Sequence, residues 1–161
     1  MGLEADAIVD GRYFEDFRPG EVIDLGTYPE LTESEIISFA LQWDPQPFHV
    51  DPEAAKESIF GGLIASGWHT GAIAMRLLVD ALLSKSHSQG SPGLDQIRFH
   101  RPVRAGDRLT GRYTVLEAEP SAKRPRLGKV MSRIELLNER GEAVLSIVST
   151  GFFDRRPEPG A

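Results

Sequence analysis

Two short segments carry the residues that could do chemistry. In the first, Asp44 and His49 lie five positions apart, with Pro45 and Pro47 between them. A carboxylate and an imidazole held close together can share a water molecule and move its proton, because histidine ordinarily titrates near neutral pH. Proline fixes its own φ and disfavours helical angles in the preceding residue. We therefore expect residues 44–49 to form a stiff, extended segment that fixes both groups.

The second segment runs from Phe60 through two glycines to Ser66 and Gly67, and a long apolar stretch follows it. Ser66 is a suitable N-cap for a helix that starts at Gly67. The first N–H groups of a helix lack intrahelical partners and lie at the positive end of its dipole. Because Gly67 has no side chain, a ligand oxygen could approach its N–H. The pattern predicts an oxyanion hole opposite the acid–base pair.

Capping residues and apolar spacing predict three helices around these segments. Thr32 and Glu35 form a capping box ahead of a helix that ends near Trp43. Asp51 is the expected N-cap of a short helix that starts at Pro52 and ends before Gly61. The helix from Gly67 is expected to run to about Ser84. Only a narrow stripe of it is polar, so we expect it to be mostly buried; the stripe is His69, Arg76 and Asp80.

Alternating apolar and polar residues predict strands before and after the helices. We expect them over residues 21–28, 97–99, 108–117, 129–137 and 143–153, with a hairpin turn at residues 138–141. Helices followed by a run of strands indicate the α+β class, here an antiparallel sheet wrapped round one buried helix. The 161 residues fit a single domain. We expect an ordered core over about residues 15–153 and a flexible tail over 154–161.

Composition excludes several classes of function. The chain contains no cysteine, so it has no disulfide, thiolate nucleophile or thiolate metal site. A net charge of −6 argues against nucleic acid as a partner. No basic start followed by an apolar run suggests a signal peptide, and charges interrupt the longest apolar stretch, so we expect no membrane span. A cytoplasmic location is the corresponding expectation.

The charges are unevenly distributed along the chain. The first 80 residues carry 15 of the 24 acidic residues but only 4 of the 18 basic ones. Arginines in the second half either form solvated strand faces or recognise a phosphate-bearing ligand, since arginine pairs with phosphate through two hydrogen bonds. The arginines concerned are Arg98, Arg101, Arg104, Arg108, Arg112, Arg124, Arg126 and Arg133.

Together, the two segments resemble the signature of the MaoC-like (R)-specific enoyl-CoA hydratase/dehydratase family. That signature is an Asp, an Asn-Pro two residues on, a His, a later Phe and an Ile-Ala-His-Gly-Met turn. The corresponding residues here are Asp44, Gln46-Pro47, His49, Phe60 and Ile64-Ala65-Ser66-Gly67-Trp68. Residues 99–107 also resemble the family's strand and turn after the central helix. The resemblance covers about residues 15–153.

The resemblance implies a hotdog fold, in which a curved antiparallel sheet wraps a long central helix. It implies reversible addition of water to a 2-enoyl thioester of CoA or a carrier protein, without a metal or organic cofactor. Homodimers or dimers of dimers, with substrate tunnels at the interface, are also implied. By position, Asp44 and His49 would hold and activate water and the Gly67 N–H would bind the thioester oxygen. The other residues expected to bind substrate are Gln46, Phe60, Ser66 and Trp68.

Three departures from the family pattern bear on substrate preference and catalytic strength. Gln46 replaces the usual Asn and is one methylene longer. Ser66 replaces the usual His before the glycine. Met75 occupies a place on the central helix where the family often has a small hydroxyl residue.

The sequence alone leaves other functions possible for these residues. The chain could be a thioesterase, with a carboxylate directing water at the carbonyl, or a non-catalytic acyl-binding or structural subunit on the same fold. Asp44, His49 and Asp51 could ligate a metal, although Asp51 is better placed as an N-cap. Independently of these alternatives, Phe60 and Trp68 could be core or tunnel lining, and His69 a hydrogen-bonded structural histidine. No Gly-x-Ser-x-Gly elbow, P-loop or Gly-x-Gly-x-x-Gly motif occurs.

Overall fold

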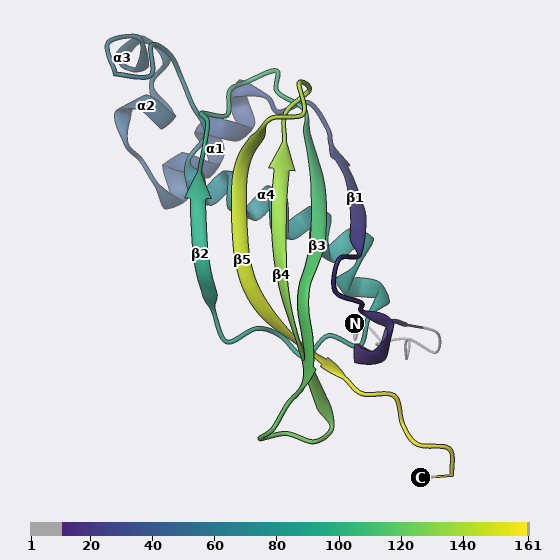
Figure 1. The fold of residues 1–161 in the computed structure, drawn as a ribbon. Helices are drawn as coiled ribbons and strands as arrows, with labels where there is room; N and C mark the ends of the chain where they lie inside the picture. The colour runs from purple at the N-terminus through teal and green to yellow at the C-terminus, as the bar shows by residue number, and fades with distance from the viewer. Residues whose placement is uncertain (1–10, 161) are drawn as a thin grey trace, which may run out of the picture.

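A computed structural model describes residues 11–160, and it shows a five-stranded antiparallel sheet wrapped round one long helix (Figure 1). The strand order is β1-β3-β4-β5-β2. Residues 1–10 and Ala161 of the predicted domain lie outside the described residues. The elements are η1 (Phe14–Asp16), β1 (Val22–Tyr28), α1 (Glu33–Trp43), α2 (Pro47–Val50), α3 (Pro52–Lys56), α4 (Gly67–Ala81), η2 (Leu83–Lys85), β2 (Leu94–Phe99), β3 (Leu109–Pro120), β4 (Leu127–Leu137) and β5 (Ala143–Asp154).

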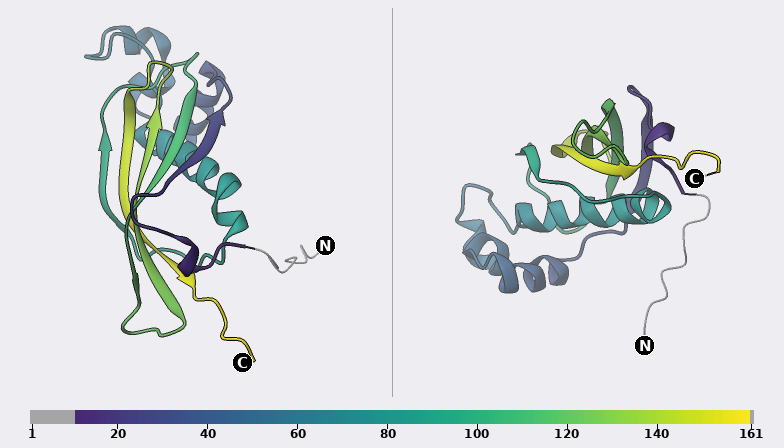
Figure 2. Two further views of the ribbon diagram at one scale, coloured as in Figure 1. Left: turned by 45° about the vertical axis from the view of Figure 1, so that its right-hand side comes forward. Right: turned by 90° about the horizontal axis from the view of Figure 1, so that it is seen from below.

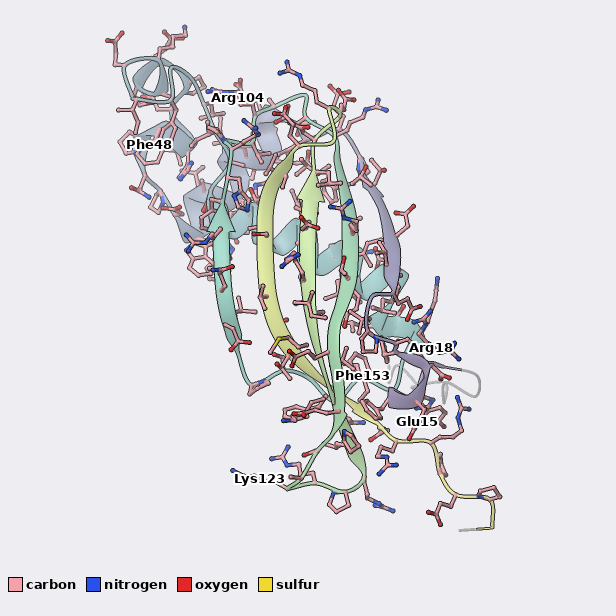
Figure 3. The ribbon with its side chains drawn as sticks, viewed as in Figure 1. Glu15, Arg18, Phe48, Arg104, Lys123 and Phe153 are labelled. Atoms are coloured by element: carbon pink, nitrogen blue, oxygen red, sulfur yellow. The ribbon has the colours of Figure 1, made fainter. Side chains whose placement is uncertain are left out.

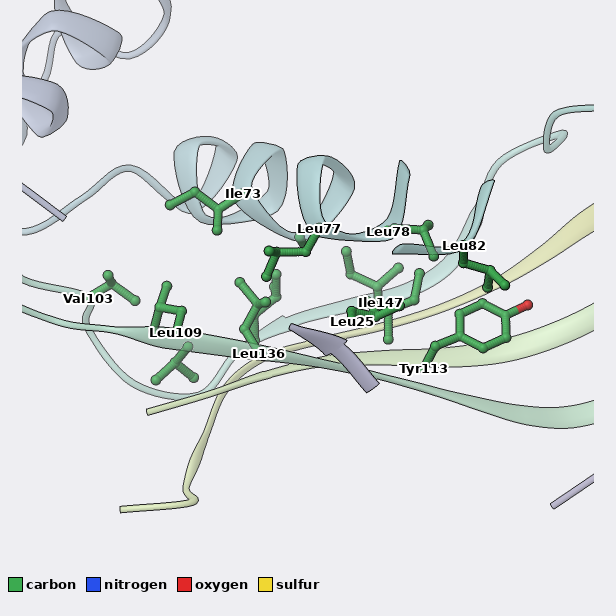
Figure 4. Close-up of a cluster of buried hydrophobic side chains, with 14 of the residues drawn as sticks. Leu25, Ile73, Leu77, Leu78, Leu82, Val103, Leu109, Tyr113, Leu136 and Ile147 are labelled. Carbon is green, nitrogen blue, oxygen red and sulfur yellow. The ribbon is translucent and has the colours of Figure 1, made fainter. Parts of the chain in front are cut away.

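Helix α4 crosses one face of the curved sheet, and the main core lies between them (Figures 2 and 4). Ile73 and Leu77 of α4 pack with Leu109 of β3 and Leu136 of β4, all of them buried. Burying a side chain of this size stabilises the fold by about 1.5–3 kcal/mol. The predicted α+β architecture is confirmed, and within residues 11–160 no helix is long and apolar enough to cross a membrane.

The prediction that α4 is mostly buried is wrong for the single chain. Its opposite face leaves Trp68, Met75 and Val79 exposed, with 64%, 52% and 37% of their surfaces accessible. The helix also ends at Ala81, before the expected Ser84, and the 3-10 turn η2 follows it. An apolar helix covered by the sheet on one side only leaves a surface that favours contact with another molecule.

The segment between α1 and α4 is only partly extended, which corrects the expectation for residues 44–49. Asp44 and Gln46 are non-helical, but Pro47–Val50 forms the short helix α2. Proline is compatible with the first position of a helix, where its missing N–H costs no hydrogen bond, so Pro47 starts α2 instead of preventing it. His49 therefore projects from a helical turn, and Asp44 from the C-cap of α1.

All strands except β1 are longer than the alternation predicts. β2 starts at Leu94 instead of residue 97, and β3 and β4 extend into a hairpin that projects beyond the sheet (Figure 1). The turn at residues 138–141 is confirmed by the hydrogen bond from the Gly141 N–H to the Asn138 carbonyl. Asp154 belongs to β5, and the next two residues of the expected tail form ion pairs, Arg155 with Glu15 and Arg156 with Asp16.

Candidate active site

The structure brings the two predicted acid–base groups into contact. His49 Nε2 lies 3.2 Å from Asp44 Oδ2, and both side chains are mostly buried. The contact depends on α2, because the helical turn directs His49 back towards the end of α1, where Asp44 is the C-cap.

The tautomer of His49 is set by its other ring nitrogen. Nδ1 lies 2.7 Å from the carbonyl oxygen of Ile64. A carbonyl oxygen only accepts hydrogen bonds, so Nδ1 must carry a proton and donate it. In the neutral ring Nε2 is therefore the basic atom, and it is the atom that faces Asp44. This arrangement suits a general base, because Nε2 can accept a proton from the side of the cavity.

Two side chains donate hydrogen bonds to the carboxylate of Asp44. Ser66 Oγ donates to Oδ2 at 2.7 Å, and Gln46 Nε2 donates to Oδ1 at 2.8 Å. Burial acts to raise the pKa of Asp44, but these two hydrogen bonds and the charge that His49 can carry outweigh it. The pKa of Asp44 therefore lies below its ordinary value, and the group is a carboxylate at neutral pH.

Ser66 couples this carboxylate to the start of α4. Its hydroxyl is fully buried and also accepts a hydrogen bond from the Trp68 N–H at 3.2 Å, which confirms Ser66 as the N-cap. It is not among the residues that line the cavity described next, and its contact with substrate stays a prediction. Ser66 instead positions Asp44.

A cavity of about 510 Å³ opens beside the pair; we call it the site cavity. Asp44, Gln46, His49 and Gly67 line one part of it, so the structure brings these predicted residues to a common space. The other lining residues are mostly apolar or aromatic, as in most small-molecule sites. They are Phe48, Phe60, Ile64, Ala65, Trp68, Thr70, Phe99, His100, Arg101, Pro102, Val103 and Val144.

Gly67 is the first residue of α4 and is in close contact with an aromatic ring. A Cβ atom on Gly67 would lie 2.6 Å from Cζ of Phe99, which is closer than real contacts allow. Among the described residues, no acceptor forms a hydrogen bond with the Gly67 N–H. A side chain at this position would therefore have to displace the Phe99 ring, and the Gly67 N–H is left without a partner that would compete with a ligand in the cavity.

Three other predicted residues have clear positions. Phe60 lines the site cavity, with its ring centroid 5.2 Å from that of Phe48. Trp68 also lines the cavity, but as an exposed residue and not as part of the core. Asp51 caps α3 by accepting hydrogen bonds from the Glu53 and Ala54 N–H groups, as predicted.

Two neighbours of the site were missed from the sequence. Phe99 packs over Gly67 from the end of β2. Arg104, in the turn after β2, donates from Nη2 to the Phe60 carbonyl at 2.6 Å and so holds the loop before α4. Figure 3 shows Arg104 near Phe48 at this end of the sheet. Both residues lie in the stretch 99–107 that resembles the family's strand and turn, but only the fold brings them to the site.

His69 is buried and stacks on Phe39 of α1, with ring centroids 4.6 Å apart. Its Nδ1 has no hydrogen-bond partner among the described residues, so the expectation of a hydrogen-bonded histidine is wrong for this atom. Burial lowers the pKa of His69, and attraction by Glu35 opposes this only in part. The ring therefore packs between α1 and α4 in its neutral form.

Comparisons with known proteins find a matching family model and similar solved structures. The MaoC-like domain model matches residues 16–134. The crystal structure of a MaoC-like dehydratase from Rhodospirillum rubrum is 40% identical, covers 92% of this chain and 100% of that chain, and superposes with a TM-score of 0.82. A Mycobacterium tuberculosis protein described as having a double hotdog fold gives a TM-score of 0.71 at 21% identity, over 95% of this chain and 48% of that one.

Among relatives, the (R)-specific enoyl-CoA hydratase of Rhodospirillum rubrum is 29% identical over 117 residues, which are 69% of this chain and 74% of that protein. Protein MaoC of Klebsiella aerogenes is 36% identical over 104 residues, 64% of this chain, but the chain spans only 30% of that protein's length. Together with the observed topology, the structural matches make this a hotdog fold.

Proposed function

We propose, from the premise that this chain belongs to the MaoC-like domain family, that it catalyses the reversible addition of water to a 2-enoyl thioester. The product is a 3-hydroxyacyl thioester, and no metal or organic cofactor takes part. The (R)-specific enoyl-CoA hydratase named above supports this choice of reaction. The observation that carries the proposal is the 3.2 Å contact between His49 Nε2 and Asp44 Oδ2 at the wall of a cavity that Gly67 also lines.

In the hydration direction, the pair would hold one water molecule on its cavity side, within reach of both Nε2 of His49 and the Asp44 carboxylate. As the water oxygen bonds to Cβ, Nε2 takes the proton that the water loses, and Asp44 stabilises the resulting imidazolium. The C=C π electrons move towards the thioester carbonyl, whose oxygen becomes negative beside the Gly67 N–H. His49 then returns the proton to Cα. Dehydration is the same sequence reversed.

The lowered pKa of Asp44 fits a mechanism in which His49 transfers the proton and Asp44 stays ionised. A carboxylate that accepts hydrogen bonds from Ser66 and Gln46 is a poor proton donor at neutral pH. It orients water and a cationic imidazole instead. The hydrogen bond from His49 Nδ1 to the Ile64 carbonyl fixes the ring so that Nε2 alone exchanges protons with the ligand.

The test is an assay with a short enoyl-CoA such as crotonyl-CoA, monitored for both the hydroxyacyl product and free CoA. Asp44→Asn and His49→Ala should each lower turnover by about 10²- to 10⁴-fold with unchanged thermal unfolding, as expected for general acid–base groups. Undiminished turnover without both side chains would contradict the proposed site. Release of free CoA without a hydroxyacyl product would indicate a thioesterase instead.

We also propose that the working unit is a homodimer. The exposed apolar side chains of α4 lie beside β2, an edge strand that within residues 11–160 pairs only with β5 and leaves Leu94 and Phe99 exposed. Unpaired strand edges beside an apolar face favour association with a second copy. Trp68 and Phe99 belong to both this face and the site cavity, so a partner would help to close the site.

A further inference from the structure

A second cavity, of about 510 Å³, follows the site cavity along α4; we call it the apolar cavity. Trp68 lines both cavities, and every other α4 residue of the apolar cavity comes after the α4 residues of the site cavity. Within residues 11–160, no charged side chain lines it. Apolar side chains of the helix and the strands form most of its wall, among them Met75, Leu78, Ile97, Ile134 and Ile147. It therefore suits an uncharged, extended chain.

The apolar cavity lies where the acyl chain of a thioester would continue from the catalytic pair. Phe99, which packs over Gly67, pairs with Leu145 on β5. Ser149 lies four residues further along β5 and lines the far part of the cavity. The separation is about 13 Å at 3.3 Å per residue, which an extended acyl chain of roughly ten carbons spans. A thioester whose carbonyl oxygen meets the Gly67 N–H would thus bring the tenth carbon close to Ser149.

Three buried hydroxyl groups interrupt the apolar wall in this far part of the cavity. Ser132 of β4 pairs with Ser149 of β5, and Tyr113 of β3 pairs with Ile134, two residues beyond Ser132. Residues two apart on a strand share a face, so all three side chains lie on the face that α4 covers. Figure 4 shows the Tyr113 ring beside Leu82, at the C-terminal end of α4. We call Tyr113, Ser132 and Ser149 the hydroxyl cluster.

Hydroxyl groups in the core are unfavourable unless they form hydrogen bonds. Ser132, Tyr113 and Ser149 have only 2%, 3% and 8% of their surfaces accessible. Ser132 interacts with the hydroxyl of Tyr113, whose pKa is raised by burial, so Tyr113 stays protonated and can donate. Among the described residues, none forms a hydrogen bond with Ser149 Oγ, which lines the cavity. A ligand oxygen at this point would satisfy it.

We propose that the preferred substrates are 2-enoyl thioesters whose acyl chain carries a hydroxyl group near its tenth carbon, held by the hydroxyl cluster. The inference rests on the proposed function, because the chain enters the apolar cavity from a thioester bound at the catalytic pair. Serine and tyrosine hydroxyls both donate and accept hydrogen bonds, as an alcohol requires. A carboxylate at the same place would have no cation to pair with in this cavity. A plain alkyl chain would leave Ser149 without a partner.

A binding titration tests the hydroxyl cluster without catalysis. The saturated thioesters 10-hydroxydecanoyl-CoA and decanoyl-CoA are titrated into the wild type, S132A/S149A and the control T150V. Thr150 follows Ser149 on β5, so its side chain lies on the opposite face of the sheet. The wild type and T150V should bind the hydroxylated thioester at least as tightly as decanoyl-CoA. S132A/S149A should bind it about 10- to 30-fold more weakly than the wild type does and keep its affinity for decanoyl-CoA within about threefold.

Two results of this titration would overturn the proposal. One is a wild type that binds decanoyl-CoA tenfold or more tightly than the hydroxylated thioester. The other is a double variant that binds both thioesters as the wild type does, or loses affinity for both alike. Y113F, which keeps the aromatic ring, gives a second measurement: it should weaken binding of the hydroxylated thioester alone.

Kinetics with two substrates separate this proposal from the proposed function. 10-Hydroxydec-2-enoyl-CoA and crotonyl-CoA share the reacting group, but only the first is long enough to reach the cluster. The ratio of their KM values should rise about tenfold in S132A/S149A and stay within about twofold of the wild-type ratio in T150V. An unchanged ratio in the double variant would overturn the proposal. If neither thioester is hydrated, the proposed function fails, and the titration with saturated thioesters still decides whether the cluster recognises a hydroxyl group.

Discussion

At the scale of single residues, the site depends on one carboxylate with three neighbours. Asp44 accepts hydrogen bonds from Gln46 and Ser66 and contacts His49. Two of these neighbours, Gln46 and Ser66, are the positions where the chain departs from the family pattern. Both donate to Asp44, so the departures keep the carboxylate ionised and oriented. They are therefore compatible with catalysis.

Ser66→Ala tests this role. Without the Ser66 hydroxyl, the pKa of Asp44 should rise towards its ordinary value. The carboxylate is the active form, so activity is lost as pH falls through the pKa of Asp44, and in S66A this loss should begin at a higher pH. The lost N-cap should also cost about 1 kcal/mol of unfolding free energy. The measurement is the acid limb of kcat against pH, together with thermal unfolding.

Thr32→Ala is the matched control for S66A. Thr32 caps α1 through its hydroxyl and does not contact Asp44. T32A should lose a similar unfolding free energy and keep the wild-type pH profile. If the acid limbs of S66A and T32A coincide, Ser66 acts only as a helix cap.

At the scale of elements, α4 connects the site to the core. Its N-terminus presents Gly67 to the site cavity, its buried face packs on the sheet, and His69 contacts α1 through Phe39. A substitution on this helix can therefore act on packing, on the site or on both. Substitutions at two glycines of α4, Gly67 and Gly71, separate these effects.

Gly67→Ala should introduce a Cβ atom into the space of the Phe99 ring. Because Phe99 is half exposed, we expect its ring to move away into the site cavity. Turnover should then fall by tenfold or more, as expected when a site is misplaced by about 1 Å. The double variant G67A/F99L should recover part of the turnover. Wild-type activity in G67A would mean that the position of the Phe99 ring does not matter for turnover.

Gly71→Ala gives the stability control on the same helix. A Cβ atom there meets no atom within 4 Å. Alanine in a helix interior is more stable than glycine by about 1 kcal/mol, so the unfolding midpoint of G71A should rise. A lower midpoint would show that the partner subunit of the proposed homodimer packs too closely against Gly71 to admit a methyl group.

His69 should make stability depend on pH. Burial lowers its pKa in the folded state, so the unfolded chain binds more protons below the ordinary value of about 6.5. Stability should therefore fall as pH drops through that value towards the folded-state pKa. Urea unfolding at pH 7 and pH 5 should show a larger loss for the wild type than for His69→Gln. Equal losses of stability in the wild type and in His69→Gln would mean that His69 has the same pKa in the folded and unfolded states.

At the scale of the whole molecule, one chain leaves an apolar face uncovered. Trp68, Met75 and Val79 of α4 and Leu94 of β2 are exposed, although the core beneath them is buried. A soluble monomer rarely exposes such a contiguous patch. The proposed homodimer would cover it and close the site cavity from the side of Trp68.

Leu94→Glu should dissociate that dimer, because it places a charge on the covered strand. Sedimentation velocity should change from a dimer to a monomer. Val22→Glu is the control: Val22 is similarly exposed, but on β1, at the other edge of the sheet. V22E should remain dimeric. A wild-type protein that sediments as a monomer at working concentration would refute the dimer.

The sequence by itself determined what depends on neighbouring residues. The Thr32, Asp51 and Ser66 caps and the strand alternation are confirmed, because capping and side-chain periodicity are local properties of the chain. The spacing of Asp44, His49 and Gly67 likewise indicated one site. The same local reasoning missed α2, since two prolines suggested an extended segment although Pro47 is favourable at a helix start.

Only the tertiary structure decided what depends on residues far apart in the chain. It placed Ser66 against Asp44 and Phe99 over Gly67. It also left one face of α4 uncovered, where composition alone predicted burial. Such contacts follow from the register and curvature of the sheet, which arise from the packing of all the strands together and which no short segment specifies.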